Sequence, residues 1–387
     1  MLSELEAEGF SLPNYGRSNV EVLKQIARGR GGLAGDREKK VFLLIDGLGY
    51  ELLDRLSRMC KHTHEATKAA HIEKLTTVFP SFTITALSSI DSGLTVAEHG
   101  IAGEKLPLKE AGVVVSILSF AAQFDQSAKL SEDYSGLIYP KPHTLNRLRK
   151  KYGFLYVQDE HIVGREYTRS MFGGADTVTY VSFEDMLLQV AKAVKSSKYE
   201  RIYAYHPIVD HSQHVYGPNS PEVALIVESA MLSLSRILLP VLEANDYNLV
   251  ITADHGQVEV MRSTNVSIGA TNGLMQYLDA PIWGMGRAPI LSVADGMEKK
   301  AEDFISRKYS KMAMLVESDE MIKSGIFGRS NVAGGIRYRF GTHMLVPKGS
   351  FYFSYLYPGK ELRLRGKKFG HHGGLSSYEM EVPLVLF

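Results

Sequence analysis

Continuous apolar runs that end in polar turns mark the strands of this chain. Residues 41–45 (Val-Phe-Leu-Leu-Ile) lead into Asp46, and the mostly apolar residues 247–253 lead into Asp254 and His255. An uninterrupted apolar run of this length predicts a strand buried on both faces, as in a parallel sheet. Similar runs predict further strands at residues 112–118, 153–158, 201–206, 288–293 and 350–356.

Helical patterns separate these strands. Apolar residues spaced three and four apart predict a helix over 183–196, and residues 47–59 and 220–243 also have helical patterns. The alternation of strand and helix favours an α/β fold with a mostly parallel central sheet and helices on both faces. We expect one catalytic domain over residues 1–387, with the less regular residues 260–365 forming a small accessory subdomain.

The composition is that of an ordinary soluble globular protein. The 387 residues carry a formal net charge of +1, which indicates neither a nucleic-acid nor a membrane-surface partner. The single cysteine, Cys60, excludes an intrachain disulfide and cysteine-based zinc sites. We find no secretory signal and no uninterrupted apolar stretch of about 18 residues. We therefore expect a cytoplasmic enzyme, and the oligomeric state stays open.

Carboxylates and imidazoles follow two of the predicted strands. Asp46 comes after the first, and the pair Asp254-His255 comes after the run at 247–253. In parallel sheets the ligand site lies beyond the carboxyl ends of the strands, and both residue types bind zinc or manganese. Taken alone, Asp46 is better explained as a cap of the next helix.

Two further segments carry the same ligand types. If residues 208–215 are helical, Asp210 and His214 share one face and can hold one ion, with His206 and His211 as rival ligands or surface residues.

The glycine-rich segment 369–376 contains His371 and His372. Adjacent residues in a tight turn do not easily point at one ion, so we expect His372 to be the ligand and His371 to face solvent or substrate. His343 is a more distant rival, and a loop with surface histidines would explain this segment in isolation.

A hydroxyl accompanies these ligands. Pro80 interrupts the chain, and a helix can begin near Thr83, where free backbone N–H groups favour a phosphate or sulfate. Simple helix capping by Ser81 or Thr83 explains the same pattern equally well. Three aspartates, three histidines and one hydroxyl suffice for two cations about 4 Å apart, which can promote in-line displacement at phosphorus or sulfur.

On these motifs the chain resembles the alkaline phosphatase superfamily and, within it, the type I phosphodiesterase/nucleotide pyrophosphatase branch. The resemblance covers residues 40–104, 201–218, 250–256 and 371–384, and the motifs occur in the family's order. The matching segments are Asp46-Gly47, Pro80-Ser81-Phe82-Thr83 followed by Gly93 and His99-Gly100-Ile101, Asp210 and His214 before Gly217-Pro218, Asp254-His255-Gly256, and His372-Gly373-Gly374.

The resemblance implies an alkaline-phosphatase-like α/β/α sandwich and a division of the ligands. One ion, zinc or manganese, would take Asp210, His214 and His372. The other would take Asp46, Asp254, His255 and the Thr83 oxygen. Thr83 would attack the phosphorus of a small-molecule phosphate diester or nucleotide pyrophosphate, and water would hydrolyse the resulting phosphothreonine.

One position departs from the branch. Members of the branch resemble each other in carrying an asparagine five residues after the histidine of His-Gly-Ile, and this asparagine binds a phosphate oxygen. In this chain the same position is Glu104. We predict Glu104 to be a substrate-binding residue, with the substrate preference open. A phosphomonoesterase, sulfatase or phosphoglycerate mutase-like enzyme is the alternative in the superfamily, and a non-catalytic metal-binding protein is the alternative of another class. Thr83 argues against the mutases, which use serine, and the context of Cys60 argues against sulfatases.

Overall fold

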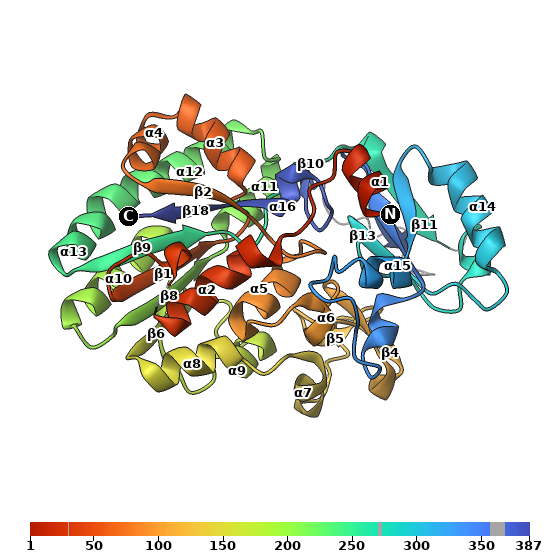
Figure 1. Ribbon diagram of the computed structural model, residues 1–387, viewed down its shortest axis with the longest axis horizontal. Coiled ribbons are helices and arrows are strands. Elements are labelled where there is room, and N and C mark those ends of the chain that lie inside the picture. The colour runs from red at the N-terminus through yellow and green to blue at the C-terminus, as the bar shows by residue number, and fades with distance from the viewer. Residues whose placement is uncertain (30, 270–272, 357–367) are drawn as a thin grey trace.

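A seven-stranded sheet forms the centre of the larger part of the molecule (Figure 1). The computed structural model describes residues 1–29, 31–269, 273–356 and 368–387. Neighbouring strands are parallel except at β18, which runs antiparallel to β2 and β9. In spatial order the strands are β2 (His71–Thr76), β18 (Glu381–Leu386), β9 (Tyr247–Thr252), β1 (Lys39–Ile45), β8 (Arg201–His206), β6 (Phe154–Asp159) and β7 (Asp176–Tyr180).

The middle strands are buried on both faces, as their apolar runs predict. Every residue of β8 and β9 is buried, and so is every residue of β1 after Lys39. The predicted strands at 41–45, 153–158, 201–206 and 247–253 therefore lie in this sheet, and the predicted α/β fold with a mostly parallel central sheet is confirmed.

Helices cover both faces of the central sheet (Figure 1). One layer contains α3 (Tyr50–Met59), α4 (Lys61–Lys68), α10 (Phe183–Ser196), α11 (Ile208–Tyr216), α12 (Pro221–Ser233) and α13 (Leu239–Ala244). The other contains α2 (Asn19–Arg28), α5 (Thr83–Ser92) and α8 (His143–Lys151). Shorter helices are α1 (Leu2–Ala7), α6 (Val96–His99), α7 (Ser135–Ile138), α9 (Glu166–Phe172) and α16 (Ser377–Met380).

The predicted helix at 220–243 is one helical stretch, Pro221–Ala244, with a π-helical turn at Leu234–Leu238. The turn has a local cause, since Pro240 has no N–H to donate to the preceding turn. By length and composition this stretch could cross a membrane, with a mean hydropathy of 1.8. A core helix passes the same test, and the buried residues Val223, Val227 and Leu234 form a one-sided stripe against the protein.

A second seven-stranded sheet, antiparallel throughout, forms the other part of the molecule. In spatial order it contains β14 (Ala313–Glu317), β15 (His343–Pro347), β13 (Ala288–Leu291), β12 (Trp283–Met285), β3 (Lys105–Leu108), β4 (Val113–Ser116) and β5 (Ala121–Ala122). The predicted strands at 112–118 and 288–293 lie here, so assigning them to the parallel sheet would be wrong. Short hairpins join β3 to β4 and β12 to β13, whereas a parallel pair needs a long crossover.

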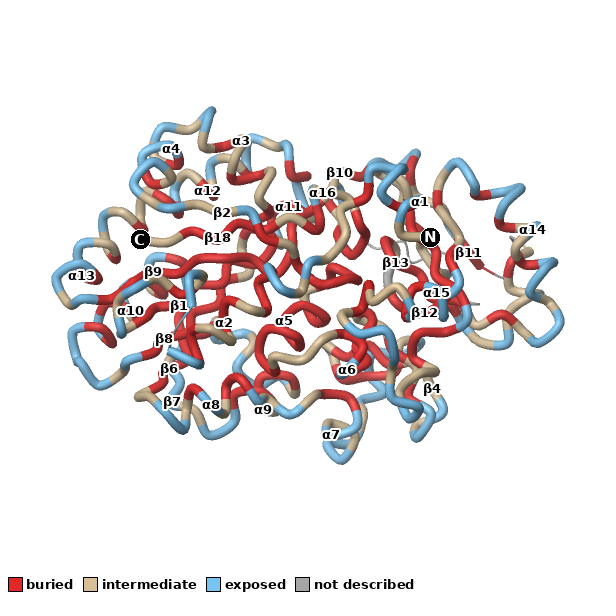
Figure 2. Tube along the Cα trace, in the orientation of Figure 1, coloured by how far each residue is buried: buried red, intermediate tan, exposed pale blue. Residues whose placement is uncertain are grey.

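Two helices and a parallel pair of strands accompany the second sheet, and an antiparallel pair of strands packs against α11. They are α14 (Glu298–Tyr309), α15 (Ser318–Lys323), the parallel pair β11 (Asn265–Gly269) and β16 (Tyr352–Leu356), and the antiparallel pair β10 (Val258–Glu259) and β17 (Gly370–His371). The second sheet thus includes residues 105–122 as well as much of the stretch 260–365. Residues 270–272 and 357–367 of the predicted subdomain lie outside the described residues. Figure 2 shows buried residues continuing from the central sheet into the second.

Candidate two-metal site

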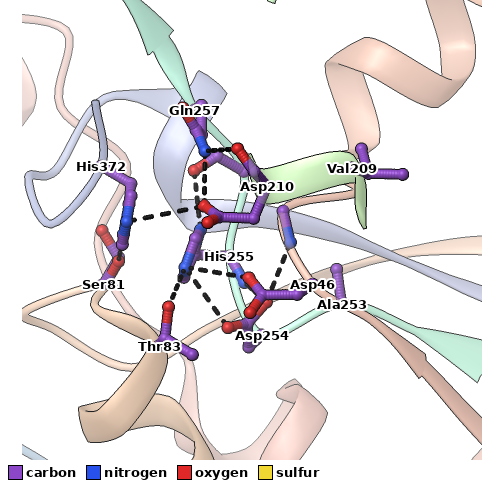
Figure 3. A network of polar contacts seen from close by, with 12 residues as sticks. Asp46, Ser81, Thr83, Val209, Asp210, Ala253, Asp254, His255, Gln257 and His372 are labelled. Carbon is purple, nitrogen blue, oxygen red and sulfur yellow. Dashed lines mark hydrogen bonds and ion pairs between the residues drawn. The ribbon is translucent and has the colours of Figure 1, made fainter. Parts of the chain in front are cut away.

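The sheet topology brings the predicted ligands together. Asp46 follows β1, and Asp254 and His255 follow the adjacent strand β9. Asp210 lies on α11, which follows β8 on the other side of β1. Six ligand residues form two groups, and within each group the ligand atoms lie within 4.8 Å of one another. The groups are Asp46, Asp254 and His255, and Asp210, His214 and His372. Figure 3 labels all of these residues except His214.

Two glycines allow the close approach of these segments. Gly47 has φ of 76°, and a Cβ there would lie 2.7 Å from the Cα of Asp210. Gly373 has φ of 119°, and a Cβ there would lie 1.8 Å from the ring of Phe82. Side chains at these positions would separate α11 from the end of β1, and the His372 turn from the start of α5.

The three histidines offer the same nitrogen to the site. Their Nδ1 atoms lie 2.7, 3.0 and 3.1 Å from backbone carbonyl oxygens, for His214, His255 and His372 in that order. A carbonyl only accepts, so each Nδ1 carries the proton and each Nε2 has a free lone pair. The Nε2 of His255 lies 3.5 Å from Asp46 Oδ1 and 3.3 Å from Asp254 Oδ2. Those of His214 and His372 each lie 3.6 Å from Asp210 Oδ1.

The carboxylates of the first group lack sufficient protein partners. Asp46 Oδ1 and Asp254 Oδ2 are buried and have no hydrogen-bond partner within the described part of the chain. Burial raises the pKa of Asp46 well above its usual range, and the nearby charges of Asp254 and Asp210 raise it further. Burial also raises the pKa of Asp254. Buried carboxylates facing bare imidazole nitrogens fit a divalent cation, because it satisfies both.

Thr83 lies at the edge of the first group. It is the first residue of α5, and its Oγ1 lies 3.0 Å from His255 Nε2, to which it donates because that nitrogen carries no proton. The N-cap of α5 is Phe82, with no side-chain capping hydrogen bond, and the Ser81 hydroxyl donates to Gly374 O at 2.8 Å. Capping therefore does not explain either hydroxyl. Thr83 is also close to the N-terminal end of the helix dipole, which favours negative charge.

Two residues that the sequence analysis missed hold the carboxylates. The Tyr205 hydroxyl donates to Asp46 Oδ2. Gln257 Nε2 donates to the backbone oxygen of Asp210 at 3.0 Å and to its Oδ1. A signal existed for Gln257, which follows the Asp-His-Gly motif directly, and for Tyr205, which lies near the end of β8 beside β1.

The rival histidines belong to neither of the two ligand groups, although His211 lines the cavity beside Thr83 and the His371 ring lies 5.7 Å from that of His214. The His371 ring packs 4.4 Å from the ring of Tyr352, centroid to centroid. His206 Nδ1 lies 2.9 Å from the Tyr180 hydroxyl. His211 is exposed, and His343 belongs to the second sheet.

A cavity of about 240 Å³ adjoins Thr83, Asp46 and Asp210. Five of its lining residues are tyrosine or phenylalanine, and it contains the buried Asp91, whose Oδ2 accepts a hydrogen bond from Tyr167 at 2.7 Å. Burial raises the pKa of Asp91 to about 7. The remaining lining side chains are Leu87, Leu118, Tyr156, Ile162, Arg165, Thr168, Phe172, Tyr203, Tyr205, Pro207 and His211.

Glu104 lines a second cavity, of about 680 Å³. Its Oε1 accepts a hydrogen bond from Ser116 Oγ at 3.0 Å. Leu118 and Arg165 line both cavities, so they lie between Glu104 and the cavity at Thr83. Glu104 is thus next to the predicted site and outside the two ligand groups, and its contact with substrate stays a prediction.

Known proteins share the sequence pattern and the fold of this chain. The sequence profile described as type I phosphodiesterase/nucleotide pyrophosphatase matches residues 40–117 and 126–375. The chain belongs to this family. The predicted family membership and activity class are confirmed, and this type I phosphodiesterase/nucleotide pyrophosphatase family member is a phosphoric ester hydrolase. A search of curated protein sequences finds no match to it.

Solved structures share the fold of this family member. Murine ectonucleotide pyrophosphatase/phosphodiesterase 5, an inactive form in complex with AMP, is 15% identical, with a TM-score of 0.64 over 90% of this chain and 87% of that chain. Phosphonoacetate hydrolase from Sinorhizobium meliloti 1021, in complex with phosphonoformate, is 17% identical, with a TM-score of 0.66 over 90% of this chain and 89% of that chain. These similarities confirm the predicted alkaline-phosphatase-like fold.

Proposed function

We propose that this protein hydrolyses small-molecule phosphate diesters or nucleotide pyrophosphates through a covalent phosphothreonine at Thr83. The observation that carries the proposal is the 3.0 Å contact between Thr83 Oγ1 and His255 Nε2. Beside it, Asp46 Oδ1 and Asp254 Oδ2 are buried oxygens without a hydrogen-bond partner in the described part of the chain. A hydroxyl at a helix start that caps nothing and faces a candidate metal group has a favourable environment for a nucleophile.

In this mechanism the Thr83 oxygen forms a bond to phosphorus as the bond from phosphorus to the leaving oxygen breaks. A diester leaves its second ester group on the phosphothreonine. Two divalent cations, which we propose to be zinc with manganese as the alternative, would stabilise the Thr83 alkoxide and the charge on the transferring group. Water then attacks the phosphorus and releases Thr83. The cavity beside Thr83 would receive an ester group.

Two neighbouring proteins support the proposal. The inactive form of the murine phosphodiesterase carries a threonine-to-alanine substitution and binds AMP. Phosphonoacetate hydrolase binds phosphonoformate, a small phosphonate. Both ligands contain a phosphorus oxyanion, the kind of group on which the proposed reaction acts.

The test is to trap the covalent adduct. The protein, loaded with zinc or manganese, is mixed with a chromogenic phosphodiester, quenched in acid and digested, and the peptide with Thr83 is examined by mass spectrometry. We expect an adduct on Thr83, and none in Thr83→Ala, whose turnover falls by at least about 10³-fold. Thr85→Ala, another threonine of the same helix, is the matched control and should retain the adduct. Turnover without an adduct, together with near-normal Thr83→Ala activity, would show direct attack by water.

A substrate panel separates the alternatives. It contains a matched phosphate diester and monoester, a nucleotide pyrophosphate and phosphonoacetate, each with added zinc or manganese. We expect the diester or pyrophosphate to react fastest. A clear preference for the monoester would favour the phosphomonoesterase alternative. Metal binding with no turnover on any substrate would favour the non-catalytic alternative.

A further inference from the structure

A third group of acidic and histidine side chains lies on the second sheet, away from the proposed hydrolytic site. It consists of Glu302, Glu317 and His343, whose ligand atoms lie within 4.8 Å of one another. Glu317 is the last residue of β14 and His343 the first of β15, and they are direct partners in the antiparallel pairing. Directly opposed residues point to the same face of a sheet. Glu302 reaches this face from α14, whose Ile305 and Tyr309 are buried.

The hydrogen bonds around His343 determine which nitrogen faces the carboxylates. The Thr342 hydroxyl donates its one proton to Leu291 O at 3.2 Å and accepts from Val293 N at 2.9 Å. His343 Nδ1 lies 3.0 Å from the same hydroxyl oxygen, which accepts from Nδ1 when the hydroxyl proton is directed at Leu291 O. In this arrangement Nδ1 carries the proton and Nε2 has a free lone pair, as in the three histidines of the hydrolytic site.

This lone pair is buried and lacks a partner. His343 is 5% exposed, and its Nε2 has no hydrogen bond within the described residues. Its nearest carboxylate oxygen is Glu302 Oε1, at 3.9 Å. A bare imidazole nitrogen facing a carboxylate is electrostatically unfavourable unless a cation lies between them.

Within the described part of the chain, no lysine makes a direct ion pair with these carboxylates. Over the described residues, Lys299 pairs with Asp303 at 3.0 Å and Lys348 with Glu8 at 2.7 Å, while Glu302 and Glu317 have no ion pair with a lysine or arginine. The group lines a cavity of about 590 Å³, which leaves room for an ion with bound water.

We propose that Glu302, Glu317 and His343 bind a divalent transition-metal ion, with zinc as the representative. One imidazole nitrogen and two carboxylate oxygens are an ordinary ligand set for this ion class. The ion cross-links α14 to the β14–β15 pair and so stabilises the second sheet. It is separate from the two ions proposed for hydrolysis, and the inference does not depend on them.

The experiment counts zinc. Full-length wild type, Glu302→Gln and His343→Ala are equilibrated in the same zinc-buffered solution, and bound zinc per chain is measured by mass spectrometry over a series of free zinc concentrations. We expect both variants to bind one equivalent less than wild type. Glu320→Gln, which removes a carboxylate from the same cavity but outside the group, is the matched control and should bind as much as wild type.

Because the result is a difference between proteins, it is independent of how many ions the hydrolytic site holds. The Glu302 side chain is 38% exposed, so we expect Glu302→Gln to fold even if His343→Ala fails to fold. Equal zinc binding by wild type and Glu302→Gln at every concentration would overturn the proposal and indicate a proton on His343 Nε2 instead. A loss of zinc in Glu320→Gln as large as in Glu302→Gln would also overturn it, because the cavity would then bind zinc by general negative charge.

Discussion

The hydrolytic site and the third group contain the same ligand types in different surroundings. The first lies at the carboxyl ends of three adjacent parallel strands, beside the helix N-terminus that presents Thr83 and a cavity with aromatic walls. The second lies on the face of an antiparallel sheet under α14. In both, the histidine Nδ1 is held by a hydrogen bond and Nε2 faces carboxylates. The comparison teaches that the ligand residues alone indicate a site for a cation. The nucleophile, the helix N-terminus and the cavity determine whether that site can also catalyse a reaction.

The largest expected difference between the two regions is in turnover. His372→Ala removes a ligand from the hydrolytic site and should lower kcat/KM by at least about 10³-fold, because a catalytic cation contributes several kcal/mol to transition-state stabilisation. Glu302→Gln, in the third group, should change kcat/KM less than about threefold. Both are measured with saturating zinc on one chromogenic diester. His371→Ala is the control beside His372 and should keep metal binding. Equal losses in His372→Ala and Glu302→Gln would break the distinction between the regions.

The next effect concerns the link between the two regions. Arg287, in the β12–β13 hairpin, makes a bidentate ion pair with Glu379 at 2.9 and 2.6 Å, and both side chains are fully buried. Glu379 also accepts from Gly374 N at 2.8 Å, in the turn that contains His372. Arg287→Met leaves a buried carboxylate without its partner, which should cost about 3–5 kcal/mol in the free energy of unfolding.

Urea unfolding of the metal-loaded protein measures this cost. Arg337→Met is the matched control, because Arg337 pairs with Asp319 at the surface, where such pairs contribute about 0–1 kcal/mol. A cost for Arg287→Met no larger than that of the control would mean that the ion pair does not connect the second sheet to the His372 turn.

The sequence predicted the central sheet and the side chains that gather at its edge because their signals are local. An apolar run that ends in Asp46 or in Asp254-His255 contains both the strand and the residue at its carboxyl end. Helical spacing placed α10 over the predicted residues 183–196. These sequence patterns do not depend on distant segments, so the elements that they predict are also present in the folded protein.

Other features depend on partners far away in the sequence. The runs at β4 and β13 have the pattern of parallel strands, and only their short hairpins reveal the antiparallel sheet. Tyr205 and Gln257 lie beside recognisable motifs in the sequence, but their partners Asp46 and Asp210 are evident only from the contacts in the folded protein. His343 entered the sequence analysis as a rival for the hydrolytic site, because nothing local connects it to Glu302 on α14.

Asp91 tests whether every buried carboxylate near the cavity needs a cation. Burial raises its pKa to about 7, so in the folded protein a proton neutralises it. The folded state then holds more protons than the unfolded state between the ordinary pKa of about 4 and about 7, and stability falls as pH rises through this window. Relative to Asp91→Asn, the wild type should lose about 2–3 kcal/mol of unfolding free energy between pH 5 and 7. A constant difference between the two proteins would indicate that Asp91 stays ionised and has a cationic partner.

The smallest expected effect is at Glu104, where the second sheet meets the hydrolytic site. Glu104 directly precedes β3, and Arg165 lies between its cavity and that of Thr83. Two like charges about 4 Å apart repel by about 1 kcal/mol in water, so a carboxylate near the substrate should disfavour a dianionic monoester more than a monoanionic diester. We therefore expect the wild type to prefer the diester. Glu104→Asn should raise kcat/KM on nucleotide-like diesters, and it should raise kcat/KM on the monoester by a further factor of about five. Glu132→Gln, which removes a carboxylate from the same cavity, is the control and should leave the ratio of the two kcat/KM values unchanged. A wild-type preference for the monoester that persists in Glu104→Asn would mean that Glu104 does not act on the phosphate, and that the second sheet contributes no charge to substrate choice at this position.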